Sequence, residues 1–169
     1  MKNKTLIASV CAASLLGLGA SGPLQAEEML VNTPRLTMDA ALRIAQATIE
    51  ACRQEGVQIA VTVVDRSGHP QVMLRDVLAM DLTLPISQQK AYTALSFNTP
   101  TGQLGARFQE PFSIMKNPTL VASAGGLPIT AAGALLGGVG VSGAPSGVTD
   151  EKCAQAGLDE VSADLEMSM

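Results

Sequence analysis

The sequence predicts an α+β fold in which helices cover the faces of a five-stranded antiparallel sheet. Segments with helical periodicity alternate along the chain with short apolar runs that are typical of strands. Tight turns join most of these runs, whereas parallel pairing would need long crossover connections. The chain has 169 residues, of which 47% are hydrophobic and 15% charged, so it is too apolar to be disordered. This length indicates a single domain.

Residues 1–26 have the layout of a secretory signal peptide. A short positive segment ending at Lys4 precedes an uncharged, mostly apolar stretch over 6–19, and Ala26 is a small residue at the expected cleavage point. The apolar stretch is shorter than the roughly 20 residues that span a bilayer, so we expect no stable membrane anchor. We therefore expect an exported protein, periplasmic or secreted, whose residues 27–169 form one domain.

The first half of this domain is predicted to be a helix followed by a hairpin. The helix covers 38–55, because Thr37 is a good N-cap and apolar residues recur at steps of three and four. Residues 58–64 alternate as a well-buried strand, 66–68 form a turn, and 71–75 return as a second strand.

The second half is predicted to hold two more helices and three closely spaced strands. One helix covers 86–97, and the last covers 150–165 with an interruption near Gly157. The segment 101–118 looks irregular and includes one short helix around 102–108. The three strands cover 119–124, 127–130 and 135–142.

Residues 138–143 fit the pattern G-x-G-x-x-G after a strand and before a helix, which is the form of a dinucleotide-binding loop. A dinucleotide-binding unit also needs a second parallel strand after that helix. Only 26 residues follow Gly143, and the last helix uses most of them. We therefore expect these glycines to allow close packing instead.

The mature chain would keep two cysteines, Cys52 and Cys153. Lone cysteines on apolar helix faces are often buried thiols, but an oxidising compartment permits a disulfide between them. The sequence leaves both possibilities open. Two cysteines and one histidine cannot make a four-ligand structural zinc site unless carboxylates complete it.

The charge balance argues against a nucleic-acid partner. The chain has 11 Lys and Arg against 15 Asp and Glu, for a net charge of −4, and aromatic residues make up 2%. Phosphate binding needs clustered cations, and base stacking needs aromatic side chains. Removing residues 1–26 would change the net charge to 9 − 15 = −6, because two lysines and no acid are lost.

His69 is the only histidine, and it lies at the predicted hairpin turn. It is either a solvated turn residue or a ligand of a metal or of haem iron, for which imidazole is a common ligand. Asp65 is close enough in sequence to suggest a Ser-His-Asp arrangement. The chain has no G-x-S-x-G motif, however, so Asp65 fits better as a hydrogen-bond acceptor in the turn.

Aromatic and basic residues gather around the second helix. The four aromatic residues lie within 21 positions, and they either fill the core or form one wall of a pocket for a flat ligand. The nearby cations either pair with an anionic ligand or are solvated surface charges. The residues concerned are Tyr92, Phe97, Phe108 and Phe112, together with Arg75, Lys90, Arg107 and Lys116.

Three segments resemble motifs of the GlcG/HbpS family of small haem-binding proteins. Residues 63–69, VVDRSGH, are similar to the family's VVD-x-x-G-H hairpin, and 90–94, KAYTA, to its K-A-x-T-A helix. Residues 125–129, GGLPI, and 137–143, GGVGVSG, resemble its GG-x-P-I … G-x-x-G-V-S-G ending. Each motif alone is modest, but their order and spacing are specific.

The resemblance implies a profilin-like fold with a five-stranded antiparallel sheet, homo-oligomers and haem binding. His69 occupies the position of a histidine common in the family, and Lys90, Tyr92 and Thr93 lie on the helix that lines its presumed ligand site. We therefore expect His69 to bind haem iron and the porphyrin to lie against Tyr92 and Phe97. Arg75 or Lys90 would face the propionates. The acidic balance of the chain opposes an anionic porphyrin unless the pocket is locally basic.

Two other functions are compatible with the sequence. The chain could act on, or bind, a small carbonyl or carboxylate metabolite without haem, with Asp65, His69 or Lys90 as the acid–base group. A pocket too small for a porphyrin would favour that alternative. The chain could also be a scaffold without a small ligand, in which case an interface would cover the His69 region.

Overall fold

The central sheet has four antiparallel strands in the order β2-β1-β4-β3. The structure is a computed structural model that describes residues 29–108 and 114–169. The chain divides at Asn32, and every helix and strand below lies in the unit 33–169. The strands are β1 (Ala60–Asp65), β2 (Pro70–Arg75), β3 (Gly126–Ala131) and β4 (Ala134–Ser142).

The predicted α+β class and antiparallel pairing are confirmed, but the prediction of five strands is wrong for the described residues. Residues 119–124 form no strand. The backbone N–H of Val121 donates instead to Thr93 Oγ1 at 3.0 Å, and Gln89 Nε2 donates to the Pro118 carbonyl at 3.1 Å. This segment is thus held by helix side chains, which take the place of a neighbouring strand.

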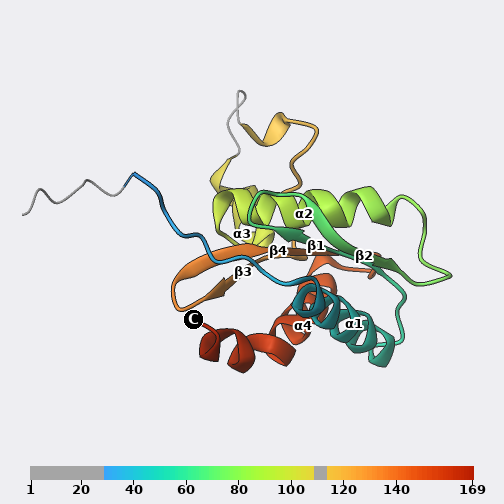
Figure 1. The fold of residues 1–169 in the computed structure, drawn as a ribbon. Helices are drawn as coiled ribbons and strands as arrows, with labels where there is room; N and C mark the ends of the chain where they lie inside the picture. The colour runs from blue at the N-terminus through green and yellow to red at the C-terminus, as the bar shows by residue number, and fades with distance from the viewer. Residues whose placement is uncertain (1–28, 109–113) are drawn as a thin grey trace, which may run out of the picture. The chain divides into compact units, whose positions relative to one another are not determined.

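Helices cover both faces of the sheet. Figure 1 shows α2 on one face and the pair α1 and α4 on the other. The described helices are α1 (Met38–Gln54), α2 (Thr83–Phe97), α3 (Thr101–Arg107), α4 (Gly147–Met167) and the short 3₁₀ helix η1 (Ile114–Lys116). None of the helices in the described part of the chain is both long and apolar enough to cross a bilayer.

The first strand is buried on both faces because each face meets a helical layer. Val61 and Val63 belong to the main hydrophobic core, which α1 and α4 cover. On the opposite face, Val64 packs in a smaller cluster with Ala91 and Leu95 of α2. A strand covered in this way is apolar on both faces, and within residues 59–64 Thr62 is the one polar residue.

The glycines of β4 are packing sites, as the sequence indicates. A Cβ atom at Gly140 would overlap the carbonyl oxygen of Ser87, and one at Gly138 would overlap that of Ala91. The backbone of α2 therefore lies directly on β4, where no larger residue fits. This contact fixes the height of α2 above the sheet, and with it the positions of the side chains on its outer face.

The last helix begins earlier than predicted and runs without interruption through Gly157. A Cβ atom at Gly157 would overlap Thr48 Oγ1, and it would come within 2.7 Å of the Ile44 carbonyl oxygen of α1. The glycine therefore marks the crossing of two helices, and the predicted break is wrong. The same two helices are joined by a disulfide between Cys52 and Cys153, whose Cα atoms lie 5.4 Å apart.

Candidate functional site

A rigid hairpin turn presents the predicted iron ligand. Asp65, the last residue of β1, accepts hydrogen bonds on Oδ1 from the backbone N–H groups of Ser67, at 2.8 Å, and His69, at 2.9 Å. Burial by itself would raise the pKa of Asp65, but these two hydrogen bonds and the nearby His69 and Arg35 lower it. The carboxylate is thus ionised and holds the turn, which confirms the interpretation of Asp65 as a turn acceptor.

The side chain of His69 is 81% exposed at this turn. Its Nδ1 lies 3.9 Å from Asp65 Oδ1. Its Nε2 has no partner among the described residues, so it is available to an external group. The separation of Nδ1 from the carboxylate is too long for a hydrogen bond, so Asp65 fixes the backbone of the turn and leaves the imidazole free to rotate.

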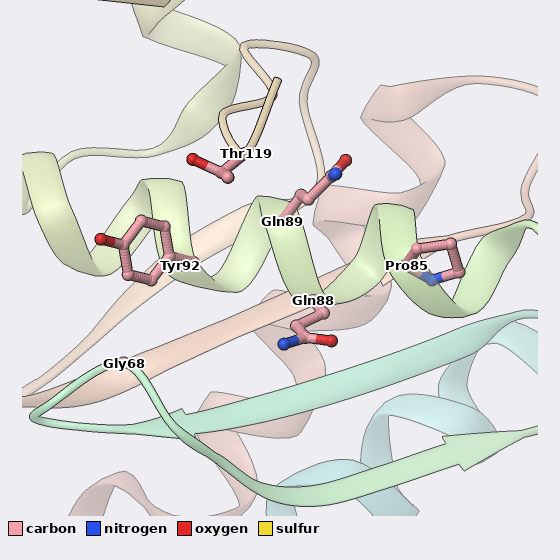
Figure 2. A pocket seen from close by; sticks show the side chains of 6 residues that line it. All are labelled: Gly68, Pro85, Gln88, Gln89, Tyr92 and Thr119. Atoms are coloured by element: carbon pink, nitrogen blue, oxygen red, sulfur yellow. The ribbon is translucent and has the colours of Figure 1, made fainter. Parts of the chain in front are cut away.

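A pocket of about 380 Å³ lies between this turn and the outer face of α2 (Figure 2). It is lined by Gly68, Pro85, Gln88, Gln89, Tyr92 and Thr119. Tyr92 is 39% exposed and rests on the turn, because a Cβ atom at Gly68 would lie 2.8 Å from its ring. The volume is within the range of small-molecule sites, which runs from about 300 to 1,000 Å³.

Tyr92 also lines a second pocket, of about 340 Å³. This pocket is lined by Arg66, Ser67, Tyr92, Leu95, Ser96, Phe97, Asn98 and Leu135. Phe97 packs against Phe108, with ring centroids 5.3 Å apart. The fourth aromatic residue, Phe112, lies outside the described residues. Two aromatic residues of α2, Tyr92 and Phe97, thus line this pocket beside the hairpin turn.

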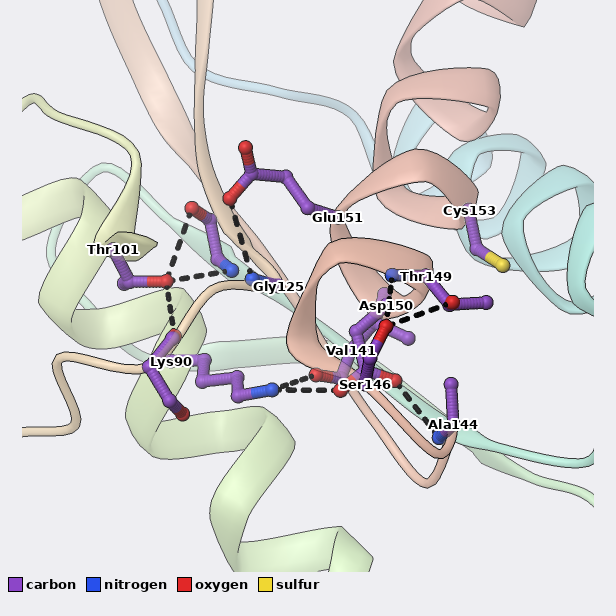
Figure 3. A network of polar contacts seen from close by, with 12 residues as sticks. Lys90, Thr101, Gly125, Val141, Ala144, Ser146, Thr149, Asp150, Glu151 and Cys153 are labelled. Carbon is purple, nitrogen blue, oxygen red and sulfur yellow. Dashed lines mark hydrogen bonds and ion pairs between the residues drawn. The ribbon is translucent and has the colours of Figure 1, made fainter. Parts of the chain in front are cut away.

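The predicted cations do not line this pocket. Lys90 points to the opposite side of α2, where its Nζ lies 2.8 Å from both Asp150 Oδ2 and the Val141 carbonyl oxygen (Figure 3). Its side chain is only 4% exposed. Arg75 lies on β2 and donates to the carbonyls of Asp76 and Ala79. The structure therefore holds neither cation in position to face a ligand beside Tyr92.

The side chain of Thr93 is buried, and its hydroxyl is hydrogen-bonded within the protein. Its Oγ1 donates to the Gln89 carbonyl at 2.7 Å and accepts from the Val121 N–H at 3.0 Å. Of the six predicted site residues, Tyr92 and Phe97 line one pocket together, whereas His69 follows Gly68 in the adjoining turn and lines neither pocket. The structure places Arg75, Lys90 and Thr93 in contacts inside the fold.

The Lys90–Asp150 pair forms the centre of a buried polar network (Figure 3). Asp150 Oδ1 accepts from the Ala144 N–H at 3.0 Å, so both oxygens of the carboxylate have partners. Burial raises the pKa of Asp150, and the Lys90 ammonium opposes that rise. The pair joins α2 to the first turn of α4, and its role is to connect the two helical layers.

The two pockets also contain residues that sequence reasoning missed: Gln88 and Thr119 in the first and Arg66 in the second. Gln88 lies one helical turn before Tyr92, so its spacing alone places it on the same face of α2. Arg66 is three positions before His69 in the same turn. Thr119 comes from the segment that was predicted to be a strand, and only the packing of that segment on α2 brings it to the site.

Residues 36–159 match the model of a protein family described as haem degrading protein HbpS-like. This chain belongs to the HbpS-like family. The match confirms the resemblance indicated by the sequence motifs, and it includes the hairpin turn, α2 and both pockets.

Solved structures and a curated relative agree with this HbpS-like assignment. A double Glu-to-Asp mutant of HbpS from Streptomyces reticuli superposes with a TM-score of 0.74 and 35% identity, covering 92% of this chain and 97% of that chain. A PduOC:heme complex gives a TM-score of 0.70 and 26% identity, covering 75% of this chain and 95% of that chain. An uncharacterized 15.0 kDa protein in the dhaT-dhaS intergenic region of Citrobacter freundii is 32% identical over 113 residues, covering 64% of this chain and 80% of that protein.

Proposed function

We propose that this HbpS-like protein binds haem at the surface formed by the hairpin turn and the outer face of α2. The observation that carries the proposal is an exposed imidazole, that of His69, next in sequence to the glycine on which Tyr92 rests. The family description names haem, and a relative with the same fold forms a complex with heme. Both findings support haem as the ligand of this protein.

The residues at the turn fit the needs of a porphyrin. A porphyrin is a wide, flat, largely apolar ring; Tyr92 lines both pockets, and Leu95 and Phe97 line the second one. Imidazole is a common ligand of haem iron, and His69 is the residue that would hold the iron here. Bound haem would supply an iron centre for redox chemistry or for binding of small molecules.

Replacing His69 by alanine should weaken haemin binding by about tenfold or more, because the substitution removes the imidazole that would hold the iron. The measurement is a titration of purified protein with haemin, followed by the shift of the Soret band. The side chain is exposed, so the variant should unfold at the same temperature as the parent. Added free imidazole should restore the parent spectrum in the variant.

An unchanged Soret band with the parent protein at stoichiometric haemin would refute haem binding. A second candidate ligand would then be a small polar carbonyl or carboxylate compound. The first pocket favours it, since two glutamine amides and the Thr119 hydroxyl line it. Lys90 and Asp65 are engaged inside the fold, so His69 would be the remaining acid–base group of the three that the sequence suggests.

We also propose that the protein is exported and that it assembles into homo-oligomers. The Cys52–Cys153 disulfide supports an oxidising compartment, although residues 1–26 themselves lie outside the described part. N-terminal sequencing of the exported protein should begin at Glu27.

Several apolar side chains of the loop between β2 and α2 are exposed, which supports self-association: Val77, Leu78, Met80 and Leu82. A mass of one chain, measured in solution by light scattering, would contradict the proposed homo-oligomer.

A further inference from the structure

Most of the cations in the described part of the chain already have partners within the protein. Nine Lys and Arg residues lie in 29–108 and 114–169. Six of them donate to carboxylates, hydroxyls or carbonyls of the protein: Arg35, Arg43, Arg53, Arg75, Lys90 and Lys152. The other three, Arg66, Arg107 and Lys116, have no such partner among the described residues. A carboxylate ligand therefore has few candidate partners.

Of these three cations, Arg66 lines a pocket of the proposed site. It borders the second pocket together with Tyr92 and Phe97. The turn that carries it is fixed by the two hydrogen bonds to Asp65 Oδ1. The neighbouring negative charge is also partly neutralised, because Asp65 Oδ2 lies 3.7 Å from the guanidinium of Arg35. Arg66 thus keeps its guanidinium available on a rigid support.

We propose that Arg66 binds a carboxylate of the ligand, and so selects flat ligands with free carboxylates at their edge. The proposal rests on the haem function proposed above, and a haem propionate is such a carboxylate. The planar guanidinium can donate two parallel hydrogen bonds to a carboxylate, which an ammonium cannot do. Arg66 therefore takes the role that the sequence suggested for Arg75 or Lys90. It also supplies a local positive charge in a chain of net negative charge.

The test compares haemin with its dimethyl ester, in which both propionates are uncharged. The parent protein should bind haemin about tenfold more tightly than the ester. Arg66→Gln should bind haemin about tenfold more weakly than the parent and should bind the ester equally well. Arg66→Lys should fall between them, because it keeps the charge but not the paired donors. Arg66 is exposed, so none of these variants should change the unfolding temperature.

Arg43→Gln is the matched control, since it removes the same charge from the layer of α1 on the opposite face of the sheet. An equal loss of haemin affinity in both glutamine variants would show a general charge effect and overturn the proposal. Equal affinity of the parent for haemin and the ester would also overturn it. In either case the haem function stands, whereas a parent protein that binds neither compound refutes the haem function itself.

Discussion

Replacing Lys90 by methionine should lower the free energy of unfolding by about 3–5 kcal/mol, because it leaves a buried carboxylate without its ion partner. Asp150 is buried, and Lys90 Nζ is the cation that contacts it at 2.8 Å. The same substitution removes the donor to the Val141 carbonyl. Urea denaturation at neutral pH, followed by circular dichroism, measures the loss.

This loss should shrink on acidification. Burial already raises the pKa of Asp150, and removal of the ammonium raises that pKa further. A raised carboxyl pKa in the folded state favours the protonated form there, so stability falls as pH rises from the ordinary value of about 3.9 through the folded-state pKa. The Lys90→Met variant should therefore be less destabilised, relative to the parent, at mildly acidic pH than at neutral pH.

Lys152→Met is the matched control. Lys152 pairs with Glu55, but both side chains are exposed, so the expected loss is about 0–1 kcal/mol. Changing Asp150 to leucine in the Lys90→Met background should recover part of the lost stability, because no unpaired charge then remains. A Lys90→Met variant that loses no more stability than Lys152→Met would contradict the structural role of the buried pair.

Removing the disulfide by the double substitution Cys52→Ala and Cys153→Ala should lower the free energy of unfolding by about 2–5 kcal/mol. The two cysteines are 101 positions apart in sequence, so the bond restricts most of the unfolded domain. For a loop of that size the chain-entropy model gives about 4.7 kcal/mol. Both side chains are buried, so the substitution also removes packing between α1 and α4.

Denaturation with and without reductant separates the contribution of the covalent bond from that of the cysteine packing between α1 and α4. Reductant should lower the urea midpoint of the parent protein and leave that of the double variant unchanged. The bond joins helices on the face of the sheet opposite α2, so the double variant should keep its haemin affinity below the unfolding transition. Equal midpoints for the parent protein with and without reductant would show that the bond contributes nothing to stability.

Local sequence patterns predicted some elements correctly and others wrongly. The helix after Thr37 was predicted nearly to its ends, because its cap and its apolar spacing depend only on nearby residues. Residues 119–124 satisfied the pattern of a strand, but Thr93 of α2 satisfies a backbone donor there. Gly157 looked like a break in the last helix, but it is the contact point at which α1 crosses α4.

The sequence by itself determined the antiparallel α+β class, the hairpin that carries His69, the packing role of the β4 glycines and the family. Only the tertiary structure decided that Lys90 pairs with Asp150, that Cys52 pairs with Cys153 and that Arg66 has no partner among the described residues. The physical reason is the range of the interactions. Capping, periodicity and turn chemistry act between neighbours in sequence, whereas ion pairs and disulfides form between whichever side chains the packed elements bring together.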